Sequence, residues 1–409
     1  MRFLIVSLGL HPDIDGGAWR VAAAQARGLA SRGHSVDVVT AQTDPPGPER
    51  ETRDGFIIHR FPQSQGQFHS NWRNENLAAR ALLAQLAANR DPGVPTLLIQ
   101  HHPYLGPAVE GVPRSIPILH IFHGPWALEY RLAQTARRRG IVRKCLDLVV
   151  PRVMRRVEAR CLRRAQRIVT LSRHFATQLP AWFPGPLPPI EVVHGGVDFD
   201  QFHPLSDADR RSVRARLGLS PDEMLFVALR RLDPRMGLDV LVDAFARVVV
   251  KHPRARLWLT GRGPAEGALR SRIERLGVGG SARLLGFVPE SEVSGLLNSA
   301  DAVVMPSLDL EGFGLVTVEA LACGTPVLGS RAGATPEILD PLDRGLLFPP
   351  ASVAGLAERL DEALRNPRGL PSRGRCAAYA RERFPWDAQL TACERLGAEL
   401  TSLTQPIAA

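Results

Sequence analysis

The chain has 409 residues and a formal net charge of +10, from 51 lysine and arginine residues against 41 aspartate and glutamate residues. Only Lys144 and Lys251 are lysines, so arginine carries nearly all of the positive charge. A hydrophobic share of 44% with 22% charged residues excludes a disordered chain, and the length predicts two domains rather than one.

The excess of positive charge is local. Residues 131–167 contain 13 basic side chains and only two acidic ones, Asp147 and Glu158. A basic surplus is typical of proteins that bind nucleic acid or anionic membranes. Because the surplus lies in one segment, we expect it to belong to one surface of the first domain.

The cysteines and the apolar runs narrow the class of protein. The five cysteines are odd in number and widely spaced, so we predict neither disulfides nor a zinc site, in a reducing cytosol. No apolar run approaches the roughly 18 residues of a membrane span. The apolar N-terminus ends in His-Pro-Asp without a small-residue cleavage site, which favours a buried first strand over a signal peptide.

Short apolar runs bounded by turn residues predict strands buried on both faces of a sheet. In the first half we expect strands at 3–9, 35–41, 56–61, 96–100, 117–122, 167–172 and 190–193, and helices at 18–31, 74–88 and 144–165. In the second half we expect strands at 225–229, 255–261, 282–288, 301–307, 325–330 and 345–350, and helices at 238–251, 265–276, 290–298, 313–322 and 352–364. This alternation predicts an α/β fold with two doubly wound parallel-sheet, Rossmann-like domains.

The stretch at 195–222 is rich in Gly, Pro and Asp and is the predicted hinge between the domains. We place the N-terminal domain at 1–200, the C-terminal domain at 201–383, and a C-terminal helix at 384–409 that packs back on the first domain. Ligands of open parallel sheets bind beyond the carboxyl ends of the strands. Two such domains facing each other would form one cleft, lined by the loops after each strand.

Two loops of the first domain are candidates for chemistry. Gly16 and Gly17 precede a helix, where backbone N–H groups can approach an anion. His123 follows a buried strand. The His101-His102 pair is its rival, but Pro103 follows that pair and no partner group can be placed beside it. We interpret the Asp-x-Asp spacing at 13–15 as a turn and not as a metal site.

The second domain has two denser loops. Arg230, Arg231 and Arg235 cluster before a helix, and guanidinium groups suit paired phosphate oxygens. Glu311 precedes a helix whose first-turn amides can face an anion, and Glu319 lies on that helix. The two carboxylates fit either a glycosidase pair or a grip on two parts of one long ligand, and the anion-ready helix favours a long phosphorylated ligand.

Longer segments give these loops a context. They include DIDGGAWRVAAAQARGLASRGHSVDVVT, FHGPW, VVHGGVDFDQFHP, RRLDPRMGLDVLVDAF, LTGRGP and EGFGLVTVEALACGTPVLGSRAGATPE, the last with a Glu-x7-Glu pattern at Glu311 and Glu319. Together they resemble the retaining glycosyltransferases of family 4, which have the GT-B fold. The resemblance extends along nearly the whole chain and implies hexosyl transfer from a UDP- or GDP-linked sugar to a glycan or lipid-linked acceptor. Such transfer would serve polysaccharide, lipopolysaccharide or glycolipid synthesis.

The resemblance implies a role for each matching residue. His123 would lie beside the donor sugar, and Glu311 would hold the sugar hydroxyls; both are assigned as catalytic. The donor-binding residues would be Gly16, Gly17 and Arg231 for the diphosphate, Phe313, Gly314 and Leu315 for sugar and phosphate through their amides, Glu319 for the ribose, and the backbone of Phe287 and Val288 for the base. No cofactor and no metal are implied, because arginines and helix dipoles would neutralise the leaving diphosphate.

The sequence departs from the family pattern at the phosphate site. The usual lysine is Met236, and the usual glycine before the phosphate arginine is Arg230. We propose that Arg235 supplies the missing positive charge. No carboxylate nucleophile can be placed opposite His123, so we expect transfer on the same face of the sugar rather than double displacement.

Three rival functions are weighed against transfer. A phosphorylase needs a lysine for pyridoxal phosphate, and neither lysine is suitably placed. A sugar-nucleotide epimerase of the same fold would need further acid and base groups. A nucleic-acid-binding protein would need polar groups that contact bases, which the arginine-rich segment lacks. In that segment, 131–167, arginines interleave with apolar residues, which suits a helix lying on an anionic leaflet. We therefore expect a cytoplasmic, peripheral membrane enzyme that does not bind nucleic acid.

Overall fold

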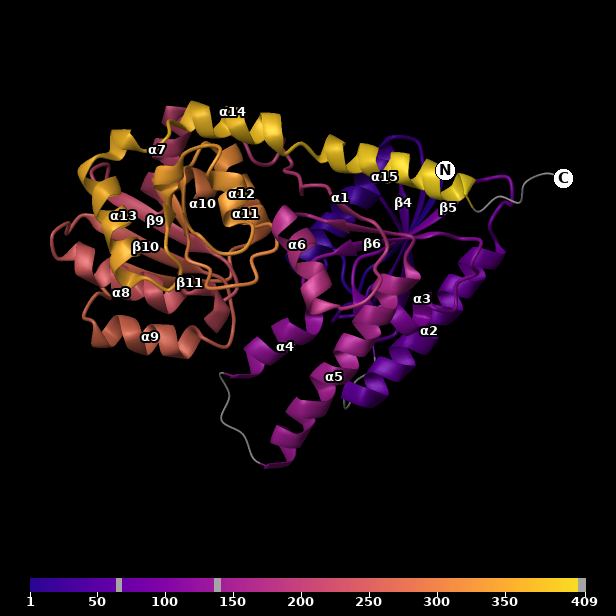
Figure 1. The fold of residues 1–409 in the computed structure, drawn as a ribbon. Coiled ribbons are helices and arrows are strands. Elements are labelled where there is room, and N and C mark those ends of the chain that lie inside the picture. Colours follow the sequence, from indigo (N-terminus) through magenta and orange to yellow (C-terminus); the bar gives the residue numbers. More distant parts are fainter. Residues whose placement is uncertain (64–67, 136–140, 404–409) are drawn as a thin grey trace. The chain divides into compact units, whose positions relative to one another are not determined.

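The computed structural model describes residues 1–63, 68–135 and 141–403, with side chains except at 68–70, 133–135 and 141–148. The described residues form two compact units (Figure 1). Unit 1 contains those within Met1–Arg131, Arg139–Gly195 and Trp386–Ala409, and unit 2 those within Leu132–Arg138 and Gly196–Pro385. The sequence analysis placed the two domain boundaries at 200/201 and 383/384. The units of the structure divide after Gly195 and after Pro385.

Unit 1 is built on an eight-stranded sheet, as far as the chain is described, in the order β3-β4-β2-β1-β5-β6-β7-β8. The strands are β1 Arg2–Val6, β2 Ser35–Ala41, β3 Arg50–Arg53, β4 Phe56–Phe61, β5 Thr96–Gln100, β6 Ile118–Phe122, β7 Arg167–Thr170 and β8 Ile190–Val192. Neighbours pair in parallel except β3, which is antiparallel to β4. The sequence missed β3 because its residues, RETR, are polar and partly exposed and form no apolar run.

Helices cover the sheet of unit 1. They are α1 Gly17–Ser31, α2 Phe68–Ala88, α3 Gly106–Val109, α4 Trp126–Thr135, α5 Ile141–Arg164, α6 Arg173–Trp182 and α15 Trp386–Ser402, with a 3-10 turn, η1, at Pro103–Leu105. The sequence predicted α1, α2 and α5 and missed the shorter α3, α4 and α6. Strand residues such as Leu4, Val39 and Ile118 pack with Leu83 of α2 and Leu105 of η1 in one apolar cluster.

The last helix, α15, packs against α1 inside unit 1. The buried amides of Gln25 and Gln389 are hydrogen-bonded, 2.9 Å apart. Arg32, which follows α1, donates to Glu394 at 2.6 Å. Gly28 allows the close approach, because a Cβ there would lie 2.4 Å from Leu390 Cδ1. These contacts hold the C-terminal helix α15 against α1, near the N-terminus, within unit 1.

Unit 2 has a six-stranded sheet in the order β11-β10-β9-β12-β13-β14, and all of these pairs are parallel. Its strands are β9 Met224–Leu229, β10 Ala255–Thr260, β11 Ala282–Gly286, β12 Ala302–Met305, β13 Val327–Ser330 and β14 Leu347–Phe348. Its helices are α7 Asp207–Arg216, α8 Leu238–Val249, α9 Glu266–Arg275, α10 Glu290–Ser299, α11 Leu315–Ala322, α12 Thr335–Leu339, α13 Val353–Arg365 and α14 Arg373–Arg383, with 3-10 turns η2 Pro234–Met236, η3 Arg344–Leu346 and η4 Pro367–Gly369. The predicted alternation of strands and helices is confirmed in both units.

The segment at 195–222, which the sequence analysis described as a hinge, contains a helix, α7, that was not predicted. Ser206 caps this helix by accepting a hydrogen bond from the Asp209 N–H at 3.1 Å. The buried Arg214 binds Asp301 at 3.0 Å and fixes α7 to the start of β12. Because α7 is held by charge and capping and not by an apolar stripe, its sequence showed no helical period.

Candidate functional site

Three loops of unit 2 follow neighbouring parallel strands, and two of them hold predicted site residues. Arg231 follows β9, beside Arg230, and Glu311 lies in the loop after β12, while the loop after β13 contains Gly333. Since the carboxyl ends of adjacent parallel strands meet at one edge of a sheet, these three loops converge. The structure thereby brings together groups that lie more than 100 positions apart in the sequence.

Glu311 is the centre of a buried polar network. Its Oε2 atom accepts hydrogen bonds from Arg230 Nη2 at 2.7 Å and from the Ser307 hydroxyl at 2.6 Å. Arg230 Nη1 also donates to Ser307 at 2.8 Å, which closes a ring of three side chains. Burial opposes ionisation of Glu311, but Arg230, the Ser307 hydroxyl and Arg235 hold its pKa below the ordinary value. Glu311 is therefore a fixed, ionised hydrogen-bond acceptor at neutral pH.

Two glycines allow the loops to close on Glu311. Gly237 has a positive φ of 66°, and a Cβ there would lie 2.0 Å from the Pro306 carbonyl oxygen. Gly333 has a φ of 57°, and its Cβ would lie 2.4 Å from the carbonyl oxygen of Glu311. The next residue, Ala334, donates its N–H to that same oxygen at 2.9 Å. Side chains at either glycine would push the loops apart.

The arginines at this edge differ in their surroundings. The Arg231 side chain is 68% exposed, with its nearest carboxylate, Asp233, 3.7 Å away. Arg235 donates to the Leu310 carbonyl at 3.1 Å. Arg230 Nη2 also lies 2.7 Å from Met236 Sδ, so a guanidinium occupies the space beside the residue that replaces the family lysine. The sequence analysis counted Arg230 in the arginine cluster and as a departure from the family pattern, but it did not place this guanidinium beside Met236.

The other predicted donor-binding residues are spread along the same edge. Gly314 begins α11 with a φ of 82°, so the helix starts at Leu315 and not at Phe313 as predicted. Phe313 and Glu319 are buried. Phe287, after β11, is 46% exposed, and the Arg262 guanidinium lies over its ring at 5.3 Å. Val288, next to it, is partly buried.

In unit 1 the glycine pair lies where the sequence placed it, between β1 and α1. Gly16 caps α1, which begins at Gly17, and a Cβ on Gly16 would lie 2.8 Å from Trp19 Cδ1. Asp13 of the same loop pairs with Arg53 at 3.0 Å and with the buried Arg60 at 2.7 Å. These pairs fix the loop to β3 and β4 and agree with a structural role for Asp13.

The two candidate histidine sites of unit 1 form one cluster. His123 follows β6 and His101 follows the adjacent β5, and His101 Nδ1 lies 3.0 Å from His123 Nε2. The expectation that no partner could be placed beside His101 was wrong, because β5 and β6 are neighbouring parallel strands that end at the same edge. The order of the strands could have revealed this partner, but the order is not visible in the sequence.

Burial keeps these imidazoles neutral. It lowers the pKa of His101 to about 3 and of His102 to about 4, and it lowers the pKa of His123 well below the ordinary 6.5, with smaller contributions from the neighbouring histidines. At neutral pH one ring of the His101–His123 pair therefore donates and the other accepts. Within the part of the chain that is described, no group of three or more His, Cys, Asp or Glu residues is arranged to hold a metal ion.

The geometry of each unit limits its chemistry. Unit 2 presents a fixed carboxylate, an exposed arginine and a helix beginning at one edge of its sheet, which suits a ligand with both hydroxyl groups and phosphates. Unit 1 presents neutral imidazoles beside a glycine loop that opens a helix. Neither set contains a second carboxylate placed beside Glu311 as a glycosidase requires, since Glu319 is buried on α11.

Comparison with known families covers both halves of the chain. Residues 15–201 match the family described as Glycosyltransferase Family 4, and residues 209–383 match the family described as Glycosyl transferases group 1. The two matches together extend over most of the sequence.

Individual relatives agree with the family matches. The chain is 30% identical over 378 residues to a D-inositol 3-phosphate glycosyltransferase of Saccharomonospora viridis, covering 88% of this chain and 83% of that protein. It is 30% identical over 245 residues to the protein of the same name from Segniliparus rotundus, where the match spans 58% of this chain but only 54% of the relative. Among solved structures, sucrose-phosphate synthase from Thermosynechococcus elongatus has the same fold, with a TM-score of 0.82, 23% identity and coverage of 98% and 99% of the two chains.

Proposed function

Because this chain belongs to the glycosyltransferases with a GT-B fold, of the group 1 and family 4 class, we propose that it is a retaining hexosyltransferase. The donor is a UDP- or GDP-linked sugar, and the acceptor is a glycan or lipid-linked hydroxyl in polysaccharide, lipopolysaccharide or glycolipid synthesis. The observation that carries this proposal is the Glu311 network, a fixed carboxylate bordered by arginines at the edge of the unit 2 sheet.

Unit 2 supplies the donor-binding groups in this proposal. Glu311 accepts hydrogen bonds from the sugar hydroxyls, and Arg231 binds the diphosphate, for which its exposed guanidinium is suited. The amides at the beginning of α11 support the sugar and the phosphate. Glu319 binds the ribose, and the backbone at Phe287 and Val288 meets the base.

Unit 1 contributes the glycine loop and His123. In the reaction the bond between the anomeric carbon and the phosphate oxygen breaks, and a bond from that carbon to the acceptor oxygen forms on the same face. The acceptor proton passes to the departing phosphate oxygen, so no separate base is needed. The arginines neutralise the leaving diphosphate, and the reaction proceeds without a cofactor or metal.

The proposal extends to where the enzyme works. The segment at 131–167 would hold the protein on the anionic, cytoplasmic face of the membrane. Residues 136–140 and the side chains of 133–148 lie outside the described part of the chain. Among the side chains that are described, Arg152, Arg156 and Arg160 of α5 are exposed. None of the described helices combines the length and apolar character needed to cross a bilayer.

The test is release of nucleotide from a panel of UDP- and GDP-linked sugars, with and without acceptors that include D-inositol 3-phosphate and lipid-linked glycans. Acceptor-dependent release is expected for one donor. His123→Ala and Glu311→Ala should each reduce turnover at least tenfold while the protein stays folded, since single electrostatic groups at a reaction centre contribute about this much or more. Glu362→Ala, at an exposed position of α13, is the matched control.

Other outcomes would assign a different function. Conversion of a nucleotide sugar without acceptor would identify an epimerase. Near-normal turnover in both variants would remove His123 and Glu311 from the site. Tight, sequence-selective binding of nucleic acid would overturn the proposal as a whole.

A further inference from the structure

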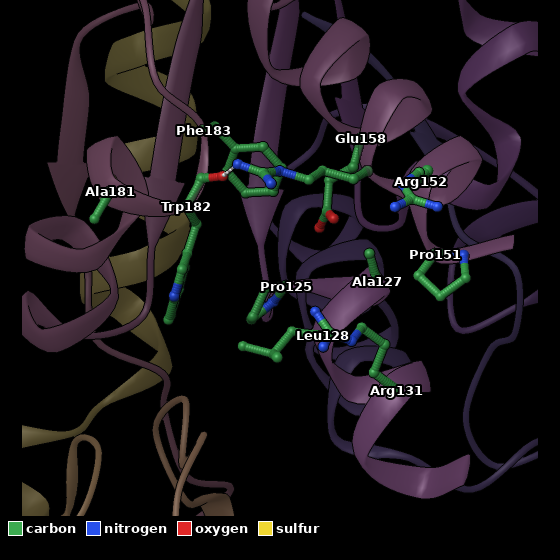
Figure 2. Close-up of a pocket in the computed structure, with 11 residues that line it drawn as sticks. Pro125, Ala127, Leu128, Arg131, Pro151, Arg152, Glu158, Ala181, Trp182 and Phe183 are labelled. Carbon is green, nitrogen blue, oxygen red and sulfur yellow. Dashed lines mark hydrogen bonds between the residues drawn. The ribbon is translucent and has the colours of Figure 1, made fainter. Parts of the chain in front are cut away.

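The backbone of the loop that carries His123 is fixed from α5. His123 follows β6, and the Trp126 N–H at the start of α4 donates to Glu158 Oε1 at 3.0 Å. Figure 2 shows the Glu158 carboxyl group pointing toward Pro125 and Ala127, at the wall of a pocket between α4, α5 and α6. Glu158 therefore holds the backbone that follows His123, but it does not determine how the imidazole of His123 is turned.

The His123 ring is oriented by His101. The side chain of His101 is buried at the end of β5, and its backbone N–H donates to the Val6 carbonyl at 2.9 Å. His101 Nδ1 lies 3.0 Å from His123 Nε2, and the ring centres are 5.3 Å apart with 21° between the ring planes. The distance between the centres is the nitrogen–nitrogen distance plus about one ring diameter, so both nitrogens lie on the line between the centres. The hydrogen bond therefore lies in the plane of both rings, along the lone pair of the accepting nitrogen.

The surroundings of His101 indicate which ring donates. Both imidazoles are neutral, so each carries one N–H. If His123 donated from Nε2, the proton of His101 would be on the Nε2 of His101, and if His101 donates from Nδ1, that Nε2 carries only a lone pair. His101 Nε2 is buried and has no hydrogen-bond partner among the described residues. A buried N–H without an acceptor is rarer in proteins than a buried acceptor with an unused lone pair, which favours donation by His101.

Donation by His101 places the proton of His123 on Nδ1. This nitrogen is the one that does not bond His101, and along the described chain it makes no other hydrogen bond. His123 is partly exposed, so the ring presents an N–H donor at the surface and not a lone pair. The neighbouring His102 has the opposite tautomer, because its Nδ1 accepts from the Tyr104 N–H at 3.1 Å and its proton is therefore on Nε2.

We propose that His101 is a positioning residue for His123: it turns the His123 ring and holds its proton on Nδ1, so that His123 donates a hydrogen bond to an oxygen of the donor sugar. This inference rests on the hexosyl transfer proposed above. His101 contacts no substrate, because its own side chain is buried. A ring that is free to turn, or that moves its proton between nitrogens, would offer this donor only part of the time, whereas a fixed ring needs no rearrangement when the sugar binds.

The tautomer can be measured without any turnover. In protein labelled with ¹⁵N in histidine, two-bond nitrogen–proton correlations distinguish a ring that is protonated on Nδ1 from one that is protonated on Nε2. The signals of His123 are assigned by their loss in His123→Gln. At pH 7 we expect His123 to be protonated on Nδ1 and His102 on Nε2. In His101→Leu, which fills the space without a donor, at least part of the His123 proton should move to Nε2.

Two variants separate the hydrogen bond from the packing. His101→Asn places an amide near the position of Nδ1 and should restore the Nδ1 tautomer of His123. His120→Leu removes an equally buried imidazole, whose Nδ1 lies 3.3 Å from Gln100 Oε1, and should leave the His123 tautomer unchanged. In turnover, the kcat of His101→Leu should fall roughly three- to tenfold with little change in KM, since one neutral hydrogen bond contributes about this much, and His101→Asn should recover part of the loss.

Two results would overturn the inference. One is a wild-type His123 protonated on Nε2, and the other is a folded His101→Leu that keeps both the Nδ1 tautomer and the wild-type kcat. If His101→Leu does not fold, the wild-type tautomer and the comparison with His101→Asn decide the matter. An Nδ1 tautomer in a protein that releases no nucleotide from any sugar donor rejects the proposed function and leaves the direction of the hydrogen bond standing. Turnover with His123 protonated on Nε2 rejects this inference alone.

Discussion

The raised pKa of Glu158 makes the stability of unit 1 depend on pH in a way that one substitution should remove. The ordinary pKa of this carboxyl is 4.5, and burial raises it to about 8 in the folded chain. Between these values the folded state keeps a proton that the unfolded state has lost. The stabilising contribution is complete below pH 4.5 and is lost as the pH rises through 8. Glu158→Gln keeps the shape and the hydrogen bond to the Trp126 N–H but cannot ionise.

The buried histidines determine which pH range isolates this effect. The pKa of His101 and of His120 is lowered to about 3, so the folded state binds fewer protons than the unfolded state between that value and 6.5. Their contribution to stability rises over that range and levels off about one pH unit above 6.5, and it is the same in the wild type and in Glu158→Gln. Between pH 6.5 and 8 the difference between the two proteins therefore reports Glu158, with the wild type losing roughly 1 to 2 kcal/mol of unfolding free energy relative to Glu158→Gln.

The assay is guanidinium unfolding at pH 6.5 and pH 8, followed by tryptophan fluorescence, to which Trp126 and Trp182 of unit 1 contribute. The difference between wild type and Glu158→Gln should grow with pH, in favour of the variant. Glu110→Gln, at an exposed glutamate of unit 1, should follow the wild type at both values. Parallel pH profiles for wild type and Glu158→Gln would refute the reasoning, because they would mean that Glu158 titrates at an ordinary pKa.

Two further predictions concern the loops of unit 2 that are proposed to bind the nucleotide sugar. Arg230→Ala should raise the KM for the nucleotide sugar at least tenfold if Arg230 replaces the family lysine, and adding Met236→Lys to that variant should recover most of the loss. A double variant that recovers nothing would contradict this role for Arg230, and an unchanged KM in Arg235→Ala would show that Arg235 does not replace the lysine. Gly333→Ala should lower the unfolding free energy by about 1 to 3 kcal/mol, because Gly333 has a positive φ and a Cβ there would lie 2.4 Å from the Glu311 carbonyl oxygen. Denaturant titration measures this change, and an unchanged unfolding free energy would mean that the loop relaxes freely.

The fold could be predicted because both sheets are built from strands buried on two faces. Runs such as 35–41 and 96–100 are mainly apolar, and the structure has β2 and β5 at these same bounds. Elements held by polar contacts escaped prediction. β3 is an edge strand of charged residues, and α7 is attached through Arg214 and Asp301, so neither has an apolar period.

Individual residues of the candidate site could be predicted from the sequence, but their arrangement in space could not. His123 and Glu311 were found from their position after buried strands and from the family pattern. The partners that fix them, His101 and Arg230, follow the adjacent strands β5 and β9, and strand order is a property of the fold and not of the sequence. Glu158 left one signal, as an acid in a segment of basic residues. Only the packing of α5 against α4 shows why it is there.

The structure also changes what the net charge of +10 means. Several arginines of 131–167 already make hydrogen bonds or ion pairs within unit 1. Arg163 donates to the Pro184 carbonyl at 2.9 Å, and Arg167 is paired with Glu399 of α15. At about 1 kcal/mol for each basic residue near an anionic surface, the pairing of Arg167 with a carboxylate lowers the attraction that the raw count suggests, whereas Arg163 keeps its charge. Membrane affinity that arises from the remaining exposed arginines should fall steeply with salt, since exposed charges are screened over about 10 Å at 0.1 M.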